Sequence, residues 1–398
     1  MGDPFRVLDI DIFPLILQHF DTNDLKKVAL VSRSWNDLIG TSRQCMKRVI
    51  CRIERPQLQL KMLEESVRQY ENFKISPHGH YQELSEILTH FYVRNVWINE
   101  TCVKEVDHSE YVNLMRSFSD TVEYLQTGDI ATKNANRVIT IDFPKLKKLH
   151  CSFSNRSAFS IFNGVNKQLE TVILSSELNS RDEEFSTHEN IITEFLTKNQ
   201  QITNLWLLHL EKLFVYDISQ KVTQKLRHIT FTTNFQNLPQ HVRENFIRFI
   251  KAQRCLEAIN IMGCREKSIL TSIWNNGVKF RKLFVIDCNY YDELSPYDLE
   301  KNMNIEEIDF YLSSSVHAYF LLSAAPNIVA YKIRQLSKQL LEFSLQLKKL
   351  KEIKFQSIDA EALKYYKNLC YKSHDKKLPK LKELDFFDYL NIDKRLNG

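Results

Sequence analysis

The sequence predicts an α/β protein in which a small helical head precedes a curved array of parallel strands, with strands on the concave face and helices on the convex face. Three observations lead to this prediction. A short apolar phrase recurs through most of the 398 residues, the segments between its copies have helical periodicity, and residues 3–41 read instead as three amphipathic helices. The chain has only 8 glycines and 9 prolines, which argues against glycine-rich phosphate loops and proline-rich linkers.

The recurring phrase has apolar residues at its first, fourth and sixth positions. Its clear copies begin at Leu146, Leu169, Ile202, Leu226, Leu256, Phe280, Ile305, Leu350 and Leu381, and weaker copies begin at Met46, Tyr70, Val93, Val122 and Ile328. Successive starts are 22 to 33 residues apart, which gives about fourteen irregular units. The fourth and sixth positions lie on one face of a short strand, and the first turns inward just before it.

Segments between the copies place apolar residues three or four apart, as an amphipathic helix does. The clearest are residues 189–196, 242–250, 269–274, 336–347 and 360–369. One strand and one helix cannot bury their apolar faces alone, so we expect neighbouring units to stack into one array over residues 46–398. A two-layer α/β domain of ordinary topology is the alternative.

This pattern resembles the leucine-rich repeat family over roughly residues 46–390. Two copies carry cysteine at the ninth position, Cys264 and Cys288, as in the cysteine-containing subclass of these repeats. The resemblance implies a solenoid in which that position satisfies backbone groups at the turn after the strand. Most other copies lack Cys or Asn there, and the longest spacings imply inserted loops or longer helices.

The head, residues 1–45, has helix start signals at Asp9 or Asp11, at Asp21 or Thr22, and at Ser32 or Ser34. We expect the three helices to end near Phe20, near Val31 and after Ile39. The first helix is apolar nearly all the way round. A unit of this size has too small a core to bury so much apolar surface, so we expect it to dock on the repeats or on a partner.

The head resembles an F-box. The residues that carry this resemblance are Leu8, Ile12, Ile16, Phe20-Asp21, Asp24-Leu25, Val28 and Val31-Ser32-Arg33-Ser34-Trp35. Asp9 stands where the family usually has proline. F-boxes bind the Skp adaptor, which links them to cullin and RING subunits. The resemblance therefore implies adaptor contacts by Leu8, Ile12, Ile16, Phe20, Leu25, Val28, Val31 and Trp35.

The fifth position of each phrase points away from the core, toward the concave face. Large apolar residues stand there at Trp97, Ile173, Trp206 and Phe284, and Asp309 stands there among neighbouring charges. Apolar anchors among polar side chains are typical of protein interfaces, so these five residues are candidate substrate contacts. The alternative is that loops or a C-terminal tail cover them.

Several other classes of function are disfavoured. Catalytic motifs are missing, the eight cysteines contain no Cys-x-x-Cys pair, and no apolar run is long enough to span a membrane. The net charge is +5, and residues 331–398 hold 16 Lys/Arg against 9 Asp/Glu. Acidic residues are interleaved with these cations, and this mixture of charges argues against a groove that binds nucleic acid. No apolar targeting segment opens the sequence, so we expect an intracellular protein.

Together with the F-box resemblance, these patterns favour a non-catalytic substrate-recognition subunit of an SCF-type cullin-RING ubiquitin ligase. In this interpretation the protein needs no cofactor or metal, and its partners are the Skp-family adaptor and an unknown protein substrate. The alternative is a leucine-rich-repeat scaffold outside ubiquitin transfer, in which the head only caps the solenoid.

Overall fold

The computed structural model forms two compact units, Met1–Gln201 (unit 1) and Ile202–Gly398 (unit 2). The structure describes residues 16–17, 19–66, 68–99, 106–128, 132–133, 139–153, 161–176, 185–222, 225–232, 239–263, 267–275, 278–286, 298–311, 315–372 and 378–384. The predicted head and the first repeats belong to the same unit, and the predicted boundary after residue 45 remains a prediction.

The helices with described bounds in the head of unit 1 are α2 (Thr22–Ala29), α3 (Arg33–Thr41) and α4 (Arg43–Met46). Helix α2 starts at Asp21, whose carboxylate accepts hydrogen bonds from the backbone N–H groups of Asn23 at 2.7 Å and Asp24 at 2.8 Å. Helix α3 starts at Ser32, whose Oγ accepts from the Trp35 N–H at 3.3 Å. Both starts follow the predicted signals. The short α4 was not predicted, and most of the predicted first helix lies outside the described residues.

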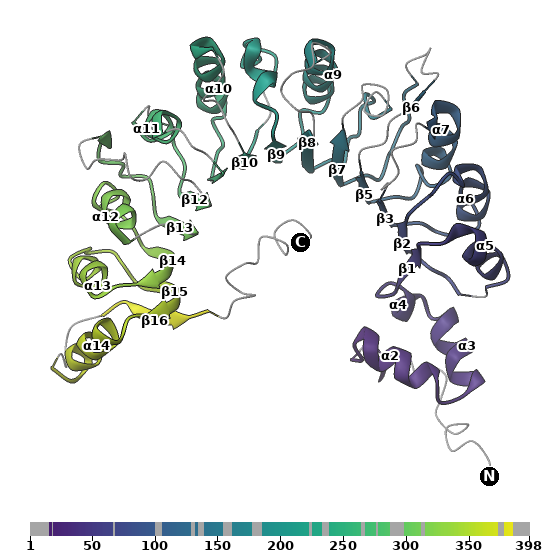
Figure 1. Ribbon diagram of the computed structural model, residues 1–398, viewed down its shortest axis with the longest axis horizontal. Helices are drawn as coiled ribbons and strands as arrows, with labels where there is room; N and C mark the ends of the chain where they lie inside the picture. Colours follow the sequence, from purple (N-terminus) through teal and green to yellow (C-terminus); the bar gives the residue numbers. More distant parts are fainter. Residues whose placement is uncertain are drawn as a thin grey trace. The chain divides into compact units, whose positions relative to one another are not determined.

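The rest of unit 1 is a parallel sheet with helices along one face (Figure 1). Its strands pair in chain order: β1 (Ile50–Ile53), β2 (Asn72–Ile75), β3 (Asn95–Ile98), β5 (Tyr124–Thr127), β7 (Lys148–Phe153) and β8 (Thr171–Ser176). The helices are α5 (Pro56–Glu64), α6 (Tyr81–Leu88), α7 (His108–Arg116) and α9 (Phe185–Lys198). A second, two-stranded parallel sheet pairs β4 (Val106–Asp107) with β6 (Thr132–Lys133).

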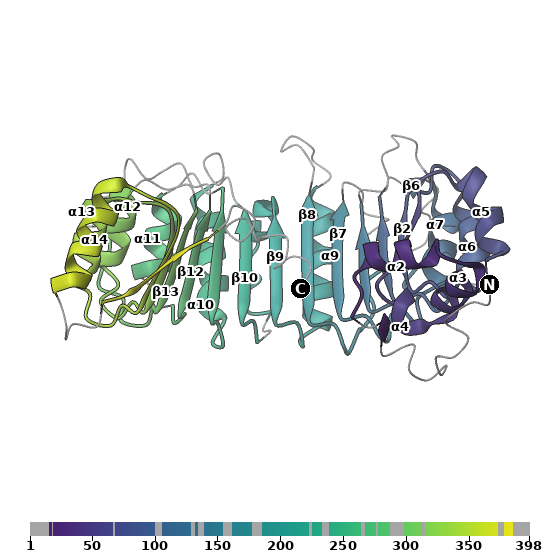
Figure 2. The same cartoon turned by 90° about the horizontal axis from the view of Figure 1, so that it is seen from below.

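Unit 2 repeats the same arrangement of strands and helices (Figure 2). Its parallel strands are β9 (Asn204–Leu208), β10 (His228–Thr232), β11 (Ala258–Met262), β12 (Lys282–Ile286), β13 (Glu307–Tyr311), β14 (Ala330–Leu336), β15 (Glu352–Ile358) and β16 (Lys380–Glu383). Its helices are α10 (Gln240–Ala252), α11 (Lys267–Asn275), α12 (Ser315–Ser323), α13 (Lys338–Ser344) and α14 (Ala360–Lys372). After β9 the helical segment is one short 3-10 helix, η1 (Glu211–Val215).

The apolar phrase forms the core of each unit. Val93, Val96 and Ile98, the first, fourth and sixth residues of one copy, are fully buried between sheet and helices, and Leu226, Ile229 and Phe231 are buried in the same way. Burial of each such side chain contributes about 1.5–3 kcal/mol. The α/β fold class, with parallel strands on one face and helices on the other, is therefore confirmed.

Buried asparagines replace glycine and proline at one connection between repeats in unit 1. The Asn199 side chain accepts from the Asn166 N–H at 2.8 Å and donates to the Phe195 carbonyl at 2.9 Å and to the Gly164 carbonyl at 3.1 Å. Asn166 Oδ1 in turn accepts from the Phe143 N–H at 3.1 Å. These amides satisfy backbone groups that the irregular turns leave unpaired. Cys264 and Cys288, predicted for that task elsewhere, lie outside the described residues.

The structure corrects three details of the sequence reading. In β1, Cys51 aligns with Phe73, so the first copy of the phrase begins two residues later than the predicted Met46. In β16, Leu381 aligns with Ile353, a fourth position, whereas the phrase placed Leu381 first. The predicted helix at 336–347 is shorter, because Leu336 still belongs to β14. None of the described helices has the length and apolar character needed to cross a membrane.

Candidate partner-binding surfaces

The head has a small apolar core of its own. Leu17, Leu25, Ile39 and Cys45 are buried together, and the partly buried side chains packed against them are Phe20, Val28, Ala29, Trp35 and Leu38. This cluster holds α2 and α3 against each other.

Among the described residues of the head, three large apolar side chains are exposed. Ile16 is 36% exposed, Leu30 is 87% exposed and Val31 is 69% exposed. Leu30 and Val31 form the tight connection after α2, where the Val31 N–H donates to the Val28 carbonyl at 3.0 Å and Ser32 then starts α3. This turn holds both side chains away from the head's core. These two adjacent exposed apolar side chains make the turn a candidate contact surface.

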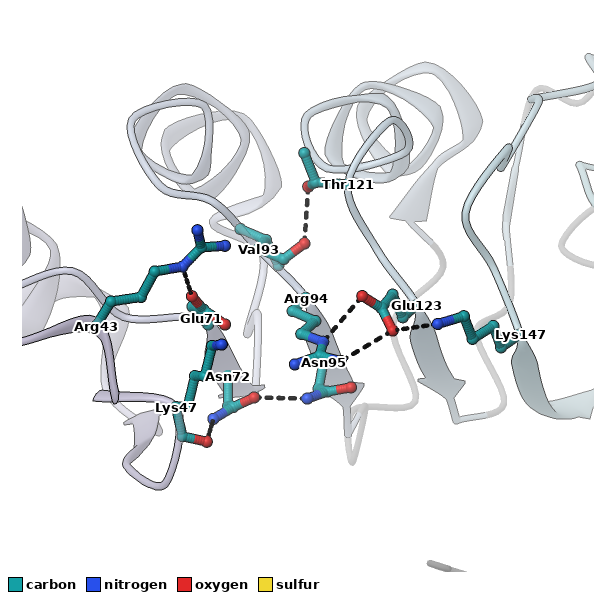
Figure 3. Close-up of polar contacts among 10 residues, drawn as sticks. All are labelled: Arg43, Lys47, Glu71, Asn72, Val93, Arg94, Asn95, Thr121, Glu123 and Lys147. Atoms are coloured by element: carbon teal, nitrogen blue, oxygen red, sulfur yellow. Dashed lines mark hydrogen bonds and ion pairs between the residues drawn. The ribbon is translucent and has the colours of Figure 1, made fainter. Parts of the chain in front are cut away.

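Polar contacts attach the head to the first repeats, and Figure 3 draws the contact between Arg43 and Glu71. Arg43 Nε donates to Glu71 Oε1 at 2.5 Å, and Arg68 Nη2 donates to Asn36 Oδ1 at 2.5 Å. Gly40 allows this approach, because a Cβ there would lie 3.1 Å from Cγ of Arg68. The head is thus packed directly on the start of the array.

A ladder of polar side chains continues from this junction along the edge where the strands begin (Figure 3). Glu123 accepts from Arg94 Nη2 at 3.1 Å and from Lys147 Nζ at 2.9 Å. Partial burial raises the pKa of Glu123, but the hydrogen bonds from Lys147 and Arg94 outweigh it and hold the pKa below its ordinary value. Glu123 therefore ties three successive strands together as a carboxylate.

The inner face of unit 1, opposite its helices, carries two of the predicted substrate residues. The register places Trp97 between Lys74 and Gln126, and Ile173 beside His150. Trp97 is half-buried, and its ring centroid lies 5.2 Å from that of Tyr124 on the next strand. Ile173 is only 1% exposed. The expectation that Ile173 stands on an open surface is therefore wrong.

The inner face of unit 2 carries the other three. Trp206 is only 8% exposed, so its expected exposure is also wrong. Phe284 is half-buried and aligns with Asp309 on the next strand. Asp309 Oδ2 lies 3.8 Å from Nζ of Lys332. Trp97, Phe284 and Asp309 remain candidates for substrate contact, and the register of unit 2 places Phe284 and Asp309 on adjacent strands.

A comparison with protein families decides the nature of the head. The family model described as the F-box domain matches residues 7–46. The head is an F-box domain. The match ends at Met46, the last residue of α4, so the unpredicted third helix of the described head belongs to the F-box.

Solved structures that are similar to large parts of this chain include a leucine-rich-repeat protein. The leucine-rich repeat-containing protein LegL7 from Legionella pneumophila is 11% identical, with a TM-score of 0.43 over 77% of this chain and 99% of its own. The complex of Rad7 and Elc1 in yeast gives 12% identity and a TM-score of 0.41 over 94% of this chain and 90% of the matched chain. A Bacteroides fragilis protein gives 11% identity and a TM-score of 0.38, covering 58% and 71% of the two chains. No curated protein matches this chain.

The F-box residues predicted to contact an adaptor have different places in the structure. Leu25 belongs to the F-box core, Phe20, Val28 and Trp35 flank it with part of their surface open, and Ile16 and Val31 are exposed. Leu8 and Ile12 lie outside the described residues. Sequence reasoning missed Leu30, the most exposed large apolar residue of the described F-box. The sequence signal for Leu30 is that it stands next to Val31, directly after the end of α2 at Ala29.

The described surfaces carry little that suggests chemistry. Among the described residues, no group of three His, Cys, Asp or Glu side chains is arranged to hold a metal ion. The thiol of Cys51 is kept protonated, because burial raises its pKa to about 12.

Proposed function

We propose that this chain is the substrate-recognition subunit of an SCF-type cullin-RING ubiquitin ligase. In this proposal the F-box binds a Skp-family adaptor, which carries the cullin and RING subunits, and the inner face of the repeats holds a protein substrate. The observation that carries the proposal is the F-box match at residues 7–46 in a chain whose remaining described residues form a strand-and-helix repeat array.

The exposed apolar residues of the F-box support an adaptor interface. Burial of Ile16, Leu30 and Val31 against a partner removes apolar surface from water, and each fully buried side chain of this kind contributes about 1.5–3 kcal/mol. The half-buried Trp35 and Phe20 beside the F-box core add aromatic surface, which is enriched among the residues that dominate binding energy.

The junction between the F-box and the repeats supports the same role. Arg43, Glu71, Arg68 and Asn36 attach the F-box to the first strands, so the adaptor and a substrate on unit 1 are held at a defined separation. A rigid receptor of this kind raises the effective concentration of the substrate near the ubiquitin donor without performing chemistry itself. Trp97 is the proposed substrate contact in unit 1, and Phe284 with Asp309 is the proposed contact in unit 2.

The test is capture of a purified Skp-family adaptor by the full chain and by the variant Ile16→Asp plus Val31→Asp. We expect the variant to lose adaptor capture by at least about tenfold, because two carboxylates must be desolvated at the interface. Circular dichroism and thermal unfolding establish that the variant remains folded.

The matched control is Leu58→Asp plus Met62→Asp, which changes two exposed apolar residues on α5 in the same unit. This control should capture the adaptor as the wild type does. Equal recovery of the adaptor by the wild type and by the F-box variant would contradict the proposal.

A second candidate function is a leucine-rich-repeat scaffold outside ubiquitin transfer. It is favoured by the way the F-box packs on the first repeats through Arg43 and Arg68, as a solenoid cap must. Under this alternative, the wild type captures no Skp-family adaptor, and the F-box variant changes only thermal stability.

A further inference from the structure

The inner faces of the two units differ in their balance of charge. In unit 1 the third and fifth positions of the paired strands hold no acidic residue. They are Ile50, Asn72, Asn95, Tyr124, Lys148 and Thr171 in one row, and Arg52, Lys74, Trp97, Gln126, His150 and Ile173 in the other. Within the described residues, Lys74 and Arg52 have no acidic side chain within ion-pair distance.

The acids nearest to this face stand one position earlier, at the edge where the strands begin. Glu71 is held by Arg43, and Glu123 is held by Arg94 and Lys147. Glu170 occupies the same position at the last strand of the unit and is exposed. The cations of the face itself are therefore not neutralised by Glu71 or Glu123, which already have basic partners.

Unit 2 offers an internal comparison. Its inner face holds lysines as well, but three of them have acids beside them: Lys282 with Glu307 at 2.8 Å, Lys354 with Glu352 at 3.1 Å, and Lys332 with Asp309 at 3.8 Å. The third and fifth positions of the described strands therefore carry ion pairs in unit 2 and hold no acidic residue in unit 1.

An aromatic platform lies between the cations of unit 1. The register aligns Lys74 on β2 with Trp97 on β3, and in the neighbouring row it aligns Tyr124 on β5 with Lys148 on β7. The Trp97 and Tyr124 rings contact each other, and Nζ of Lys148 lies 5.4 Å from the centre of the Tyr124 ring. The Tyr124 hydroxyl donates to Gln126 Oε1 at 3.0 Å, which fixes the ring. All of these side chains are partly exposed.

We propose that the inner face of unit 1 binds an acidic segment of a protein, with an apolar or aromatic side chain on Trp97 and Tyr124 and flanking carboxylates at Lys74 and Lys148. The inference deepens the proposed function, on which it rests for the identity of this segment as part of a substrate. Lys74 and Lys148 are three strands apart and two positions apart along the strands, or roughly 16 Å at about 4.8 Å per strand and about 3.3 Å per residue. Four residues of an extended chain span about 13 Å, and the long lysine and glutamate side chains cover the remainder, so the carboxylates are spaced i and i+4.

The electrostatics of the face support an anionic ligand. Burial lowers the pKa of Lys148, and burial together with the nearby Lys148 lowers the pKa of His150. A carboxylate placed here stabilises the charged lysine. A nucleic acid fits less well, because phosphate backbones are held by more cations, about six to ten in strong complexes, than the three that this face provides.

The test is fluorescence anisotropy with the labelled peptide Ser-Gly-Glu-Ser-Phe-Ser-Glu-Gly-Ser and the full chain. We expect saturable binding that weakens with added salt, and loss of binding when both glutamates are replaced by lysine. Lys74→Glu should weaken binding by at least about tenfold, as expected when an attractive charge contact becomes repulsive, and Lys74→Arg should retain it. Lys354→Glu, the matched control on unit 2, should change affinity by less than about twofold.

Three results would overturn the inference: no saturable binding of the glutamate peptide, equal affinities for Lys74→Glu and Lys354→Glu, or tighter binding of a labelled oligothymidylate than of the peptide. Adaptor capture with the same samples separates this inference from the proposed function. Peptide binding without adaptor capture would contradict the ligase proposal and support the peptide site. Adaptor capture without peptide binding would support the ligase proposal and contradict the peptide site.

Discussion

Arg43 Nε donates a hydrogen bond of 2.5 Å to Oε1 of Glu71, and this pair joins helix α4 of the F-box to the residue that directly precedes strand β2 of the repeats. The two partners differ in environment, because the Glu71 side chain is 3% exposed and the Arg43 side chain is 61% exposed. Glu71 Oε2 is also buried and has no hydrogen-bond partner among the described residues. The buried carboxylate therefore depends on one guanidinium that reaches it from solvent.

The first prediction concerns Arg43→Met, which keeps the aliphatic stem and removes the charge. It should lower the free energy of unfolding by about 1–3 kcal/mol, the usual cost of a buried polar group without its partner. Glu71→Gln in the same background should recover part of the loss, because a neutral amide is easier to bury. Urea unfolding in a double-mutant cycle measures the coupling.

The control for this prediction is Lys27→Met, which breaks a solvent-exposed ion pair with Asp24 on α2. Exposed pairs contribute about 0–1 kcal/mol, so this change should have little effect. Equal losses for Arg43→Met and Lys27→Met would contradict the role given to the Arg43 and Glu71 pair.

The second prediction concerns Asn72, a buried side chain that connects three segments (Figure 3). Its Nδ2 donates to the Lys47 carbonyl at 2.8 Å and to the Val49 carbonyl at 3.2 Å, and its Oδ1 accepts from Asn95 Nδ2 at 2.6 Å. Asn72→Leu leaves these partners unpaired, and we expect a loss of about 2–3 kcal/mol. Native-state hydrogen exchange should show faster exchange of β1 and β2 amides than in Asn95→Ala, which loses one of these bonds.

The repeat fold was predictable because every repeat must bury the first, fourth and sixth positions of the phrase. Register was less predictable at the ends of the array. At β1, Val49, Cys51 and Ile53 are all apolar and two residues apart, so a shift of two keeps the same face inward and periodicity alone cannot choose. At β16, the sixth position holds Glu383 instead of an apolar residue, and the phrase was therefore read three residues too late.

The candidate sites were predictable in part for a related reason. The phrase tells which side chains face away from the core, but not how exposed each of them is. It therefore could not separate the buried Ile173 and Trp206 from the half-buried Trp97 and Phe284. The ion pairs along the strand edge do have a signal in the sequence. One repeat position runs Glu71, Arg94, Glu123 and Lys147, and this alternation of sign on adjacent strands is what a ladder of ion pairs requires.

The third prediction concerns pH and His108, which is buried at the start of α7. Neither ring nitrogen has a hydrogen-bond partner among the described residues, and burial lowers the His108 pKa against the opposing effect of Asp107. The unfolded chain therefore binds a proton at a higher pH than the folded chain. This contribution to stability is complete above the unfolded pKa of about 6.5 and is lost as the pH falls toward the folded value.

Thermal unfolding from pH 8 to pH 5 checks this prediction by comparing the wild type with His108→Leu. The variant should lose less stability over this interval, because it lacks the one proton that His108 takes up when the wild type unfolds. Two other histidines, His150 and His228, also have lowered pKa values and contribute to both proteins alike, so the difference between the curves isolates His108. Parallel curves would show that His108 does not titrate on unfolding.

The fourth prediction concerns a buried hydroxyl pair in unit 2. Ser344 Oγ donates to the Leu340 carbonyl at 2.6 Å, so the Tyr331 hydroxyl, 2.7 Å away, is the donor to Ser344. Tyr331→Phe removes one neutral hydrogen bond and should cost about 1 kcal/mol. Ser344→Ala leaves the tyrosine hydroxyl buried without an acceptor and should cost more, about 1–3 kcal/mol.

Urea unfolding of both variants and of the double variant gives this order directly, and the double variant should lose less than the sum because no hydroxyl is left unpaired. Tyr319→Phe, at an exposed tyrosine of α12, is the control and should be nearly neutral. Burial raises the pKa of Tyr331, so its hydroxyl should titrate by ultraviolet absorbance only once unit 2 unfolds. A smaller loss for Ser344→Ala than for Tyr331→Phe would reverse the donor assignment, because the hydroxyl left without a partner would then be that of Ser344.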